Sequence, residues 1–223
     1  MKEKIKEIIG GLGADICGVA NIDRFENIPF GFHPKDIYKD CKSVIVFAKH
    51  MPKGLSCVSP RIIYIKATDI NLAELDRISY LASIEIEKLG GIAIPLPSDS
   101  PYEYWDNDNM TGKGLLSMRH AAMLAGLGSI GKNTLIINRH YGNMINIGAV
   151  LSNLDLESDP LAEELCIPSC HLCIDSCPQK ALNGNTTNQK LCREFTYSEN
   201  ERGFGVCNCN KCRTICPRAF GIK

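Results

Sequence analysis

Cysteine is the residue whose number and spacing carry the most chemistry in this chain. Nine of the twelve cysteines lie between residues 166 and 216. They form the runs Cys166-x3-Cys170-x2-Cys173-x3-Cys177-Pro178 and Cys207-x-Cys209-x2-Cys212-x3-Cys216-Pro217, with Cys192 between the two runs. Cysteine thiolates are the ligands of iron–sulfur clusters, and four of them hold one [4Fe–4S] cubane. The repeated C-x2-C-x3-C-P spacing therefore predicts two [4Fe–4S] clusters.

The spacing also predicts which cysteines share a cluster. In the bacterial ferredoxin run C-x2-C-x2-C-x3-C-P, the fourth cysteine ligates the other cluster when two are present. The predicted sets are Cys166, Cys170, Cys173 and Cys216 for one cluster, and Cys177, Cys192, Cys209 and Cys212 for the other. The first run departs from the pattern, because three residues separate its first two cysteines. Cys207 is left over, and it is a possible substitute for Cys209 or Cys192.

Two other uses of clustered cysteines have to be weighed. Structural zinc also takes C-x2-C pairs, but it does not need the C-x3-C-P endings, and nine cysteines exceed two four-cysteine sites by one. Disulfides are disfavoured because residues 1–7 contain no apolar signal-peptide segment. We therefore expect a cytoplasmic protein in which cysteine binds metal. No run of about 18 apolar residues exists, so we expect no membrane helix.

Composition and charge limit the fold and the partners. Lys plus Arg equals Asp plus Glu at 25 each, and this balance gives no electrostatic case for strong nucleic-acid binding. A chain of 223 residues with 44% hydrophobic residues suits one core domain and a small module. We predict an α/β (α+β) domain over residues 1–158. A ferredoxin-like domain with two [4Fe–4S] clusters is predicted over residues 159–223.

The first domain shows alternating helix and strand signals. Helices are predicted over 3–12, 71–89 and 115–125, and strands over 16–20, 43–48, 92–96, 135–138 and 144–151. Asn71 with Glu74 resembles a capping box that would begin the second of these helices. Pro95 predicts that its strand lies at a sheet edge or ends there.

Residues 126–134 form a glycine-rich segment, GLGSIGKNT. It matches G-x-G-x-x-G and nearly matches the P-loop, but it follows a predicted helix and opens a strand, which is the reverse of both motifs. We therefore reject a nucleotide site and predict a tight loop whose backbone another group approaches closely. Residues 98–114 form a long polar loop that contains the only tryptophan, Trp105. This loop is either a lid or substrate wall or an Ω-loop packed on itself. Cys57 has no evident role.

At this point the residues resemble a known family. Residues 125–138, AGLGSIGKNTLIIN, followed by Tyr141-Gly142, are similar to the AGLGWIGKNTLLIN segment of epoxyqueuosine reductases. Cys192 lies where that family has its isolated cluster ligand, and Cys209-x2-Cys212-x3-Cys216-Pro217 matches its final motif. The resemblance covers roughly residues 90 to 218, and the plan is also similar to that of reductive dehalogenases.

The resemblance implies a cobalamin held between the α/β domain and the two clusters. Electrons from a low-potential donor, such as ferredoxin or flavodoxin, would pass through the clusters to cobalt. The corrin pocket would be lined by the glycine loop, at Gly126, Leu127, Gly128, Gly131, Lys132 and Asn133. The implied substrate is a small molecule or a modified tRNA base.

The sequence departs from the family at three places. Asp99-Ser100-Pro101 lacks the small residue of the D-[ST]-[AG]-P segment, which carries the family's general acid, and Asp99 is the corresponding candidate. Ser129 replaces the tryptophan of GLGWIG. The sequence ends at Lys223, before the helical repeats that help those enzymes hold tRNA, so tRNA is a doubtful partner.

Three functions follow from these observations. The first is an iron–sulfur reductase that uses cobalamin on an unidentified substrate. The second is epoxyqueuosine reduction by a minimal enzyme. The third is a two-cluster electron-transfer protein without a substrate of its own.

Overall fold

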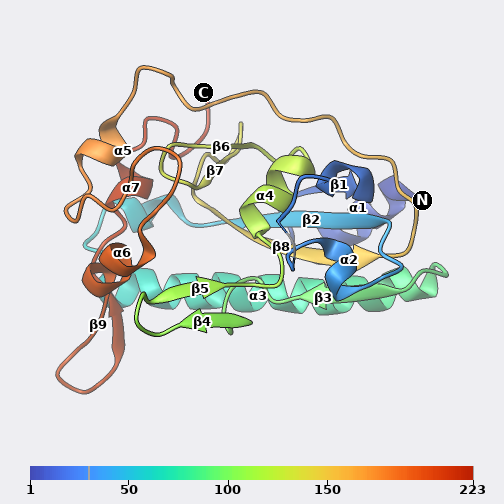
Figure 1. The fold of residues 1–223 in the computed structure, drawn as a ribbon, viewed down its shortest axis with the longest axis horizontal. Helices are drawn as coiled ribbons and strands as arrows, with labels where there is room; N and C mark the ends of the chain where they lie inside the picture. Colours follow the sequence, from blue (N-terminus) through green and yellow to red (C-terminus); the bar gives the residue numbers. More distant parts are fainter. Residues whose placement is uncertain (30, 223) are drawn as a thin grey trace.

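A four-stranded sheet organises the first part of the chain, in a computed structural model that describes residues 1–29 and 31–222 (Figure 1). The strand order is β1-β2-β8-β3, and every neighbouring pair is antiparallel. The strands are β1 (Ile16–Asn21), β2 (Ser43–His50), β3 (Ala93–Leu96) and β8 (Ile145–Ser152). The helices that cover the sheet are α1 (Lys2–Gly11), α3 (Arg61–Lys88) and α4 (Met118–Leu124).

The central strand β2 is buried on both faces. Its side chains alternate between these faces and contribute to two hydrophobic cores. Val46 and Ala48 pack on the face that α4 covers, together with Ala121. Ile45 and Phe47 lie on the opposite face and pack with residues of α1 and α3. Side chains of a strand alternate between the two faces of a sheet, so one continuous apolar run serves both layers.

Short elements complete the chain. They are η1 (Ile22–Phe25), α2 (Pro34–Ile37), η2 (Lys53–Ser56), the hairpin β4 (Tyr104–Asp106) with β5 (Thr111–Lys113), and the hairpin β6 (Ser129–Ile130) with β7 (Ile136–Ile137). The cysteine-rich part contributes α5 (Leu172–Asp175), α6 (Gln189–Thr196), β9 (Tyr197–Glu199), β10 (Gly205–Cys207) and α7 (Lys211–Thr214). None of the helices in residues 1–29 and 31–222 has the length and apolar character to cross a membrane.

The predicted fold class holds in its α+β form. Helix and strand signals alternate along the sequence, but the sheet contains no parallel pair, because irregular chain and short helices connect β1 to β2 in place of a crossover helix. The edge position predicted from Pro95 is confirmed, since β3 is the last strand of the sheet. The strand predicted over 135–138 is reduced to the two-residue β7.

The predicted start of the long helix at Asn71 is wrong. Helix α3 begins at Arg61, and Asn71 lies inside it. The amide of Asn71 is buried and donates to the backbone oxygen of His50, 3.0 Å away, so it bonds to the sheet and does not cap a helix end. Tyr64 packs in a separate buried cluster with Cys207, and this contact with the cysteine-rich part stabilises the first turns of α3.

The cysteine-rich part lies at the N-terminal end of α3, on the left of Figure 1. The chain reaches it by a long extended segment that follows β8. Asp159 fixes the start of this segment, because its carboxylate accepts hydrogen bonds from Lys6, at 3.1 Å, and from the backbone of Val19, at 2.9 Å. The predicted division between residues 158 and 159 falls within this segment and stays a prediction.

Candidate metal centres

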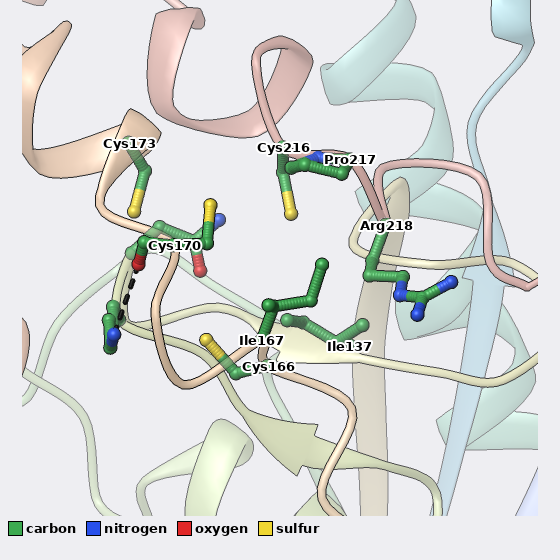
Figure 2. A pocket seen from close by; sticks show the side chains of 10 residues that line it. Ile137, Cys166, Ile167, Cys170, Cys173, Cys216, Pro217 and Arg218 are labelled. Carbon is green, nitrogen blue, oxygen red and sulfur yellow. Dashed lines mark hydrogen bonds between the residues drawn. The ribbon is translucent and has the colours of Figure 1, made fainter.

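One cavity is shared by the four cysteines predicted for the first cluster. Cys166, Cys170, Cys173 and Cys216 all line it. Figure 2 shows their sulfur atoms directed into a common space, with Cys216 arriving from the second run and the other three from the first. The sulfurs lie on different sides of that space, which suits a cubane in which each iron takes one thiolate. Ligation by this set stays a prediction.

The second predicted set gathers around α7. Cys212 lies in this helix, and the thiols of Cys192, Cys209 and Cys177 are close enough to act electrostatically on it. Cys177 belongs to the first run, so each run sends its last cysteine toward the other set. The short helix α5 precedes Cys177, and the short helix α7 precedes Cys216. These crossed positions are those that the C-x3-C-P spacing predicts.

Cys207 occupies a different environment from its neighbour Cys209. Cys207 lies in β10, is 3% exposed and packs with Met51, Tyr64 and Met144. Its thiol donates to the backbone oxygen of Cys209 at 3.4 Å. Cys209 instead lines an open depression at the surface. The structure therefore favours Cys209 as the ligand and Cys207 as part of the apolar packing.

Three buried donors beside the cysteine sets find no acceptor within residues 1–29 and 31–222. They are Ser176 Oγ, Asn210 Nδ2 and Arg218 Nε, and each lies within two residues of a predicted ligand. A buried donor without a partner costs about 1–3 kcal/mol. The sulfur atoms of a cluster accept hydrogen bonds, and those bonds help to set its reduction potential. The donor set therefore fits iron–sulfur clusters at both places.

The thiols of Cys212 and Cys173 favour their neutral form when no iron compensates their charge. Burial raises the pKa of Cys212 to about 11, and the nearby thiols of its set raise it while Arg213 lowers it. Burial also raises the pKa of Cys173, and Cys216 and Cys166 add to this effect. Ligand thiolates must be deprotonated, so iron has to displace these protons when a cluster forms.

We expect cluster assembly on the cluster-free protein to become more favourable as pH rises from about 6.5 to 8.5. The raised pKa of Cys212 keeps its proton bound throughout this range, so the proton is released on iron binding. Each proton released raises the equilibrium constant about tenfold per pH unit. Anaerobic titration with chelator-buffered iron and sulfide, followed by visible absorbance, measures this slope. A loading curve that does not move with pH would contradict it.

The glycine loop is closed by its own chain. A Cβ atom on Gly126 would lie 2.1 Å from the backbone oxygen of Pro160, and one on Gly128 would lie 2.3 Å from that of Ile137. The close approach predicted for this loop is thus made by carbonyls of the same molecule. Gly131 likewise faces the side chain of Ile137, and Leu127 is buried in the core. The corrin-lining role predicted for this loop stays a prediction.

Lys132 and Asn133 connect the same loop to both cysteine runs. Lys132 Nζ donates to the backbone oxygen of Cys170 at 3.0 Å and also to that of Pro168. Asn133, which is buried, donates through Nδ2 to the backbone oxygen of Cys212 at 3.0 Å. Because one residue holds the first run and its neighbour holds the second, this loop fixes the two sets relative to each other.

The loop of residues 98–114 forms the hairpin β4–β5, which docks on α6. The side chain of Gln189 bonds to both backbone groups of Gly112, at 3.0 and 3.2 Å. Lys190 Nζ donates to the backbone oxygen of Asp108 at 2.8 Å. Helix α6 also carries Cys192, so the hairpin is attached directly to a predicted cluster ligand. Neither prediction for this loop, a lid or a self-packed Ω-loop, included that attachment.

Arg193 completes the contact between the hairpin and α6. Its guanidinium carbon lies 5.0 Å from the ring centre of Tyr102 and 5.2 Å from that of Trp105, and the two rings stack on each other. Arg193 also donates to the Tyr102 hydroxyl, which donates to Asp99 Oδ1, both at 3.1 Å. Asp99 is exposed, and this chain of hydrogen bonds links it to the residue beside Cys192. Its role as proton donor stays a prediction.

Sequence reasoning missed Arg193, Gln189 and Lys190, for which the only signal was their proximity to Cys192. Cys57, which the sequence left without a role, is exposed, and among the described residues its thiol has only the hydroxyl of Ser56 within hydrogen-bonding distance, at 3.9 Å.

We expect Arg193→Gln to loosen the hairpin from α6. The substitution removes a cation–π contact worth about 0.5–1 kcal/mol at an exposed site. Since Trp105 is the only tryptophan, its fluorescence reports on the hairpin alone. Emission should shift to longer wavelength, and acrylamide quenching should increase. Arg202→Gln, at an exposed position of the β9–β10 turn, is the matched control. Unchanged emission in Arg193→Gln would contradict the contact.

This architecture is similar to that of known proteins. The whole chain superposes on an epoxyqueuosine reductase from Streptococcus thermophilus, with a TM-score of 0.69, 21% identity and 67% of that chain covered. The chain has an epoxyqueuosine reductase-like fold. A curated epoxyqueuosine reductase from Bacillus anthracis is 28% identical to it over 251 aligned positions. That match takes in 95% of this chain but 62% of the relative, so the chain is shorter than the enzymes it resembles.

The epoxyqueuosine reductase-like fold extends to a second group of proteins. A reductive dehalogenase, whose structure suggests a mechanism for B12-dependent dehalogenation, superposes with a TM-score of 0.70 and 16% identity. The superposition covers 96% of this chain and 31% of that one. The chain matches no protein-family model.

Proposed function

We propose that this protein is an iron–sulfur reductase that carries electrons through two [4Fe–4S] clusters. The observation that carries the proposal is the crossed placement of the last cysteine of each run, which lies with the cysteines of the other set. The first run supplies three sulfurs to the first set, and the second run supplies two to the second set beside Cys192. Cys216 is the crossing residue at the first cavity, and Cys177 is the crossing residue around α7. The loop at Lys132 and Asn133 holds both runs, so the two clusters have a fixed separation for electron transfer.

The reductase part of the proposal is supported by the likeness to epoxyqueuosine reductases and reductive dehalogenases. We propose cobalamin as the group that receives the electrons, by analogy with the B12-dependent relative. Cobalamin would supply a strongly reducing cobalt centre. The role of the glycine loop in holding cobalamin stays a prediction, and carbonyl groups of the same chain already approach Gly126 and Gly128 closely. A low-potential carrier such as ferredoxin or flavodoxin is the proposed donor, and the substrate is a small molecule or a modified base.

Anaerobic reconstitution of the full chain tests this function. About eight irons and eight sulfides per chain are expected for two cubanes. The protein is then mixed with hydroxocobalamin, passed through a desalting column and examined by visible spectroscopy. Retained corrinoid with a shifted band supports a cobalamin reductase. Two intact clusters with no retained corrinoid would limit the protein to electron transfer, and zinc in place of iron would remove the proposal altogether.

Reduction of epoxyqueuosine is a second candidate, favoured by the 95% of this chain that aligns with a curated epoxyqueuosine reductase. A strain lacking its own enzyme provides the test, with queuosine in tRNA measured after expression of this chain. Restored queuosine identifies the substrate. Continued accumulation of epoxyqueuosine, with a cluster-loaded protein present in the cells, excludes it.

A further inference from the structure

An open depression lies against the second cysteine set. Cys209 forms part of its wall, and the remainder is lined by Pro60, Ser176, Pro178, Asn208, Asn210 and Lys211. The depression therefore places a predicted cluster ligand at the protein surface. The cavity of the first set is lined, besides its cysteines, by Ile137 of β7, Lys132 of the glycine loop and Ile167. A redox partner outside the molecule can therefore approach the second set at Cys209.

Basic residues line this depression or lie next to its lining in the sequence. The charged residues that line it, or lie within two positions of its lining, are Arg61, Lys180, Lys211, Arg213 and the single carboxylate Asp175. Arg213 is directed inward, because it donates to the backbone oxygen of Ile145 at 3.1 Å. Arg61, Lys180 and Lys211 are exposed, so three cations face solvent against one carboxylate. The chain as a whole is neutral, and this local excess is therefore a property of the face.

A hydrogen bond also links the two segments that form this face. Arg61 donates to Asn208 Oδ1 at 3.1 Å, which joins the start of α3 to the second cysteine run. Val58 and Ile62, on either side of Pro60, are 44% and 54% exposed. A small apolar contact bordered by charge is typical of weak electron-transfer complexes, which bury less than about 1,200 Å². Charge complementarity in such complexes sets the rate of encounter more than the affinity.

We propose that an acidic one-electron carrier protein docks on this face, around Arg61, Lys180 and Lys211, and reduces the cluster held by Cys209. The proposal rests on the proposed function, since it needs that cluster. In the transfer the carrier loses one electron, and the [4Fe–4S]2+ cluster becomes [4Fe–4S]1+. No bond is made or broken, and no proton is required. The second cluster then passes the electron to the first.

The test compares two reductants on the full, cluster-loaded protein by anaerobic stopped-flow spectroscopy. One reductant is a reduced acidic plant-type [2Fe–2S] ferredoxin, and the other is photoreduced deazaflavin, a small molecule that does not need a docking face. We expect the double variant Lys180→Glu with Lys211→Glu to lower the ratio of the ferredoxin rate to the deazaflavin rate about tenfold or more at low salt. Lys4→Glu, at an exposed position of α1, is the matched control and should keep the parental ratio.

The outcomes separate the docking face from the function. A parental ratio in the double variant overturns the docking face while leaving a two-cluster reductase in place. In case the double variant does not fold, the parental protein itself gives an answer. The rate at which ferredoxin reduces it should fall steeply as the salt concentration rises from about 20 to 500 mM. A reduction rate that does not depend on salt overturns the proposal. Salt-dependent dimerisation through the same lysines would identify a second copy as the occupant and would also overturn it. Failure of the parental chain to assemble clusters would remove the proposed function instead.

Discussion

Cys177→Ser is expected to remove the cluster that it shares with Cys192, Cys209 and Cys212, and to leave the neighbouring cluster in place. Iron should fall from about eight to about four per chain, because one thiolate of four is lost. The surviving signal should belong to the set that contains Cys216. This result would be unexpected if each run held its own cluster, since Cys177 lies only four residues from Cys173. Iron analysis and electron paramagnetic resonance of the reduced protein measure it.

Two further variants make this test specific. Cys216→Ser should remove the other cluster and leave the set around Cys212, giving a different residual signal. Cys207→Ser is the matched control, because this thiol packs in the apolar cluster and donates to Cys209 O. It should keep about eight irons. If Cys207→Ser loses a cluster and Cys209→Ser does not, the two cysteines have exchanged roles. Identical residual signals in Cys177→Ser and Cys216→Ser would rule out the crossed arrangement.

Gly142→Ala is expected to destabilise the protein by about 3 kcal/mol or more, from a left-handed backbone and overpacking together. Gly142 has φ +62°, and a Cβ atom there would lie 2.1 Å from the backbone oxygen of Arg218 and 2.3 Å from that of Ala219. These are backbone atoms that cannot rotate away. The segment that must move directly follows Cys216, so the cavity of the first set is expected to open and its cluster to be lost more readily.

Gly90→Ala separates the two causes. Gly90 has φ +88°, but no atom lies within 4 Å of its added Cβ, so this variant carries the backbone strain without the collision. It should cost only about 1–2 kcal/mol and leave both clusters in place. Anaerobic thermal unfolding followed by circular dichroism gives the stabilities, and iron loss to a chelator gives the cluster lability. Equal losses in the two variants would contradict the role assigned to the contact with residues 218–219.

The sequence of the glycine loop predicts the conformation of the loop but not its contacts. Its sequence correctly predicted a tight loop between a helix and a strand, in which glycine permits a close approach. It could not identify the approaching group, because Pro160 and Ile137 meet the loop only through the tertiary fold. The contacts of Lys132 and Asn133 with the cysteine runs were inaccessible for the same reason, since they join residues about 40 and 80 positions apart.

The start of α3 was decided by tertiary packing. The local cap signal at Asn71 predicts a helix start there, but the burial of Tyr64 with Cys207 extends the helix back to Arg61. Short-range propensity is weak compared with the burial of an aromatic side chain, so the local signal did not set the boundary.

The sequence by itself determined which residues can bind metal, and the tertiary structure decided their arrangement. Ligand type and spacing are local properties, so the C-x3-C-P endings predict two cysteine sets and their crossing, and ligation by these sets stays a prediction. The antiparallel order of the sheet, the attachment of the hairpin at Arg193 and the basic face around Lys211 depend on which distant segments meet. These contacts form because both apolar faces of one sheet are buried and because the buried polar groups must find hydrogen-bond partners. No short stretch of sequence specifies which distant segments supply them.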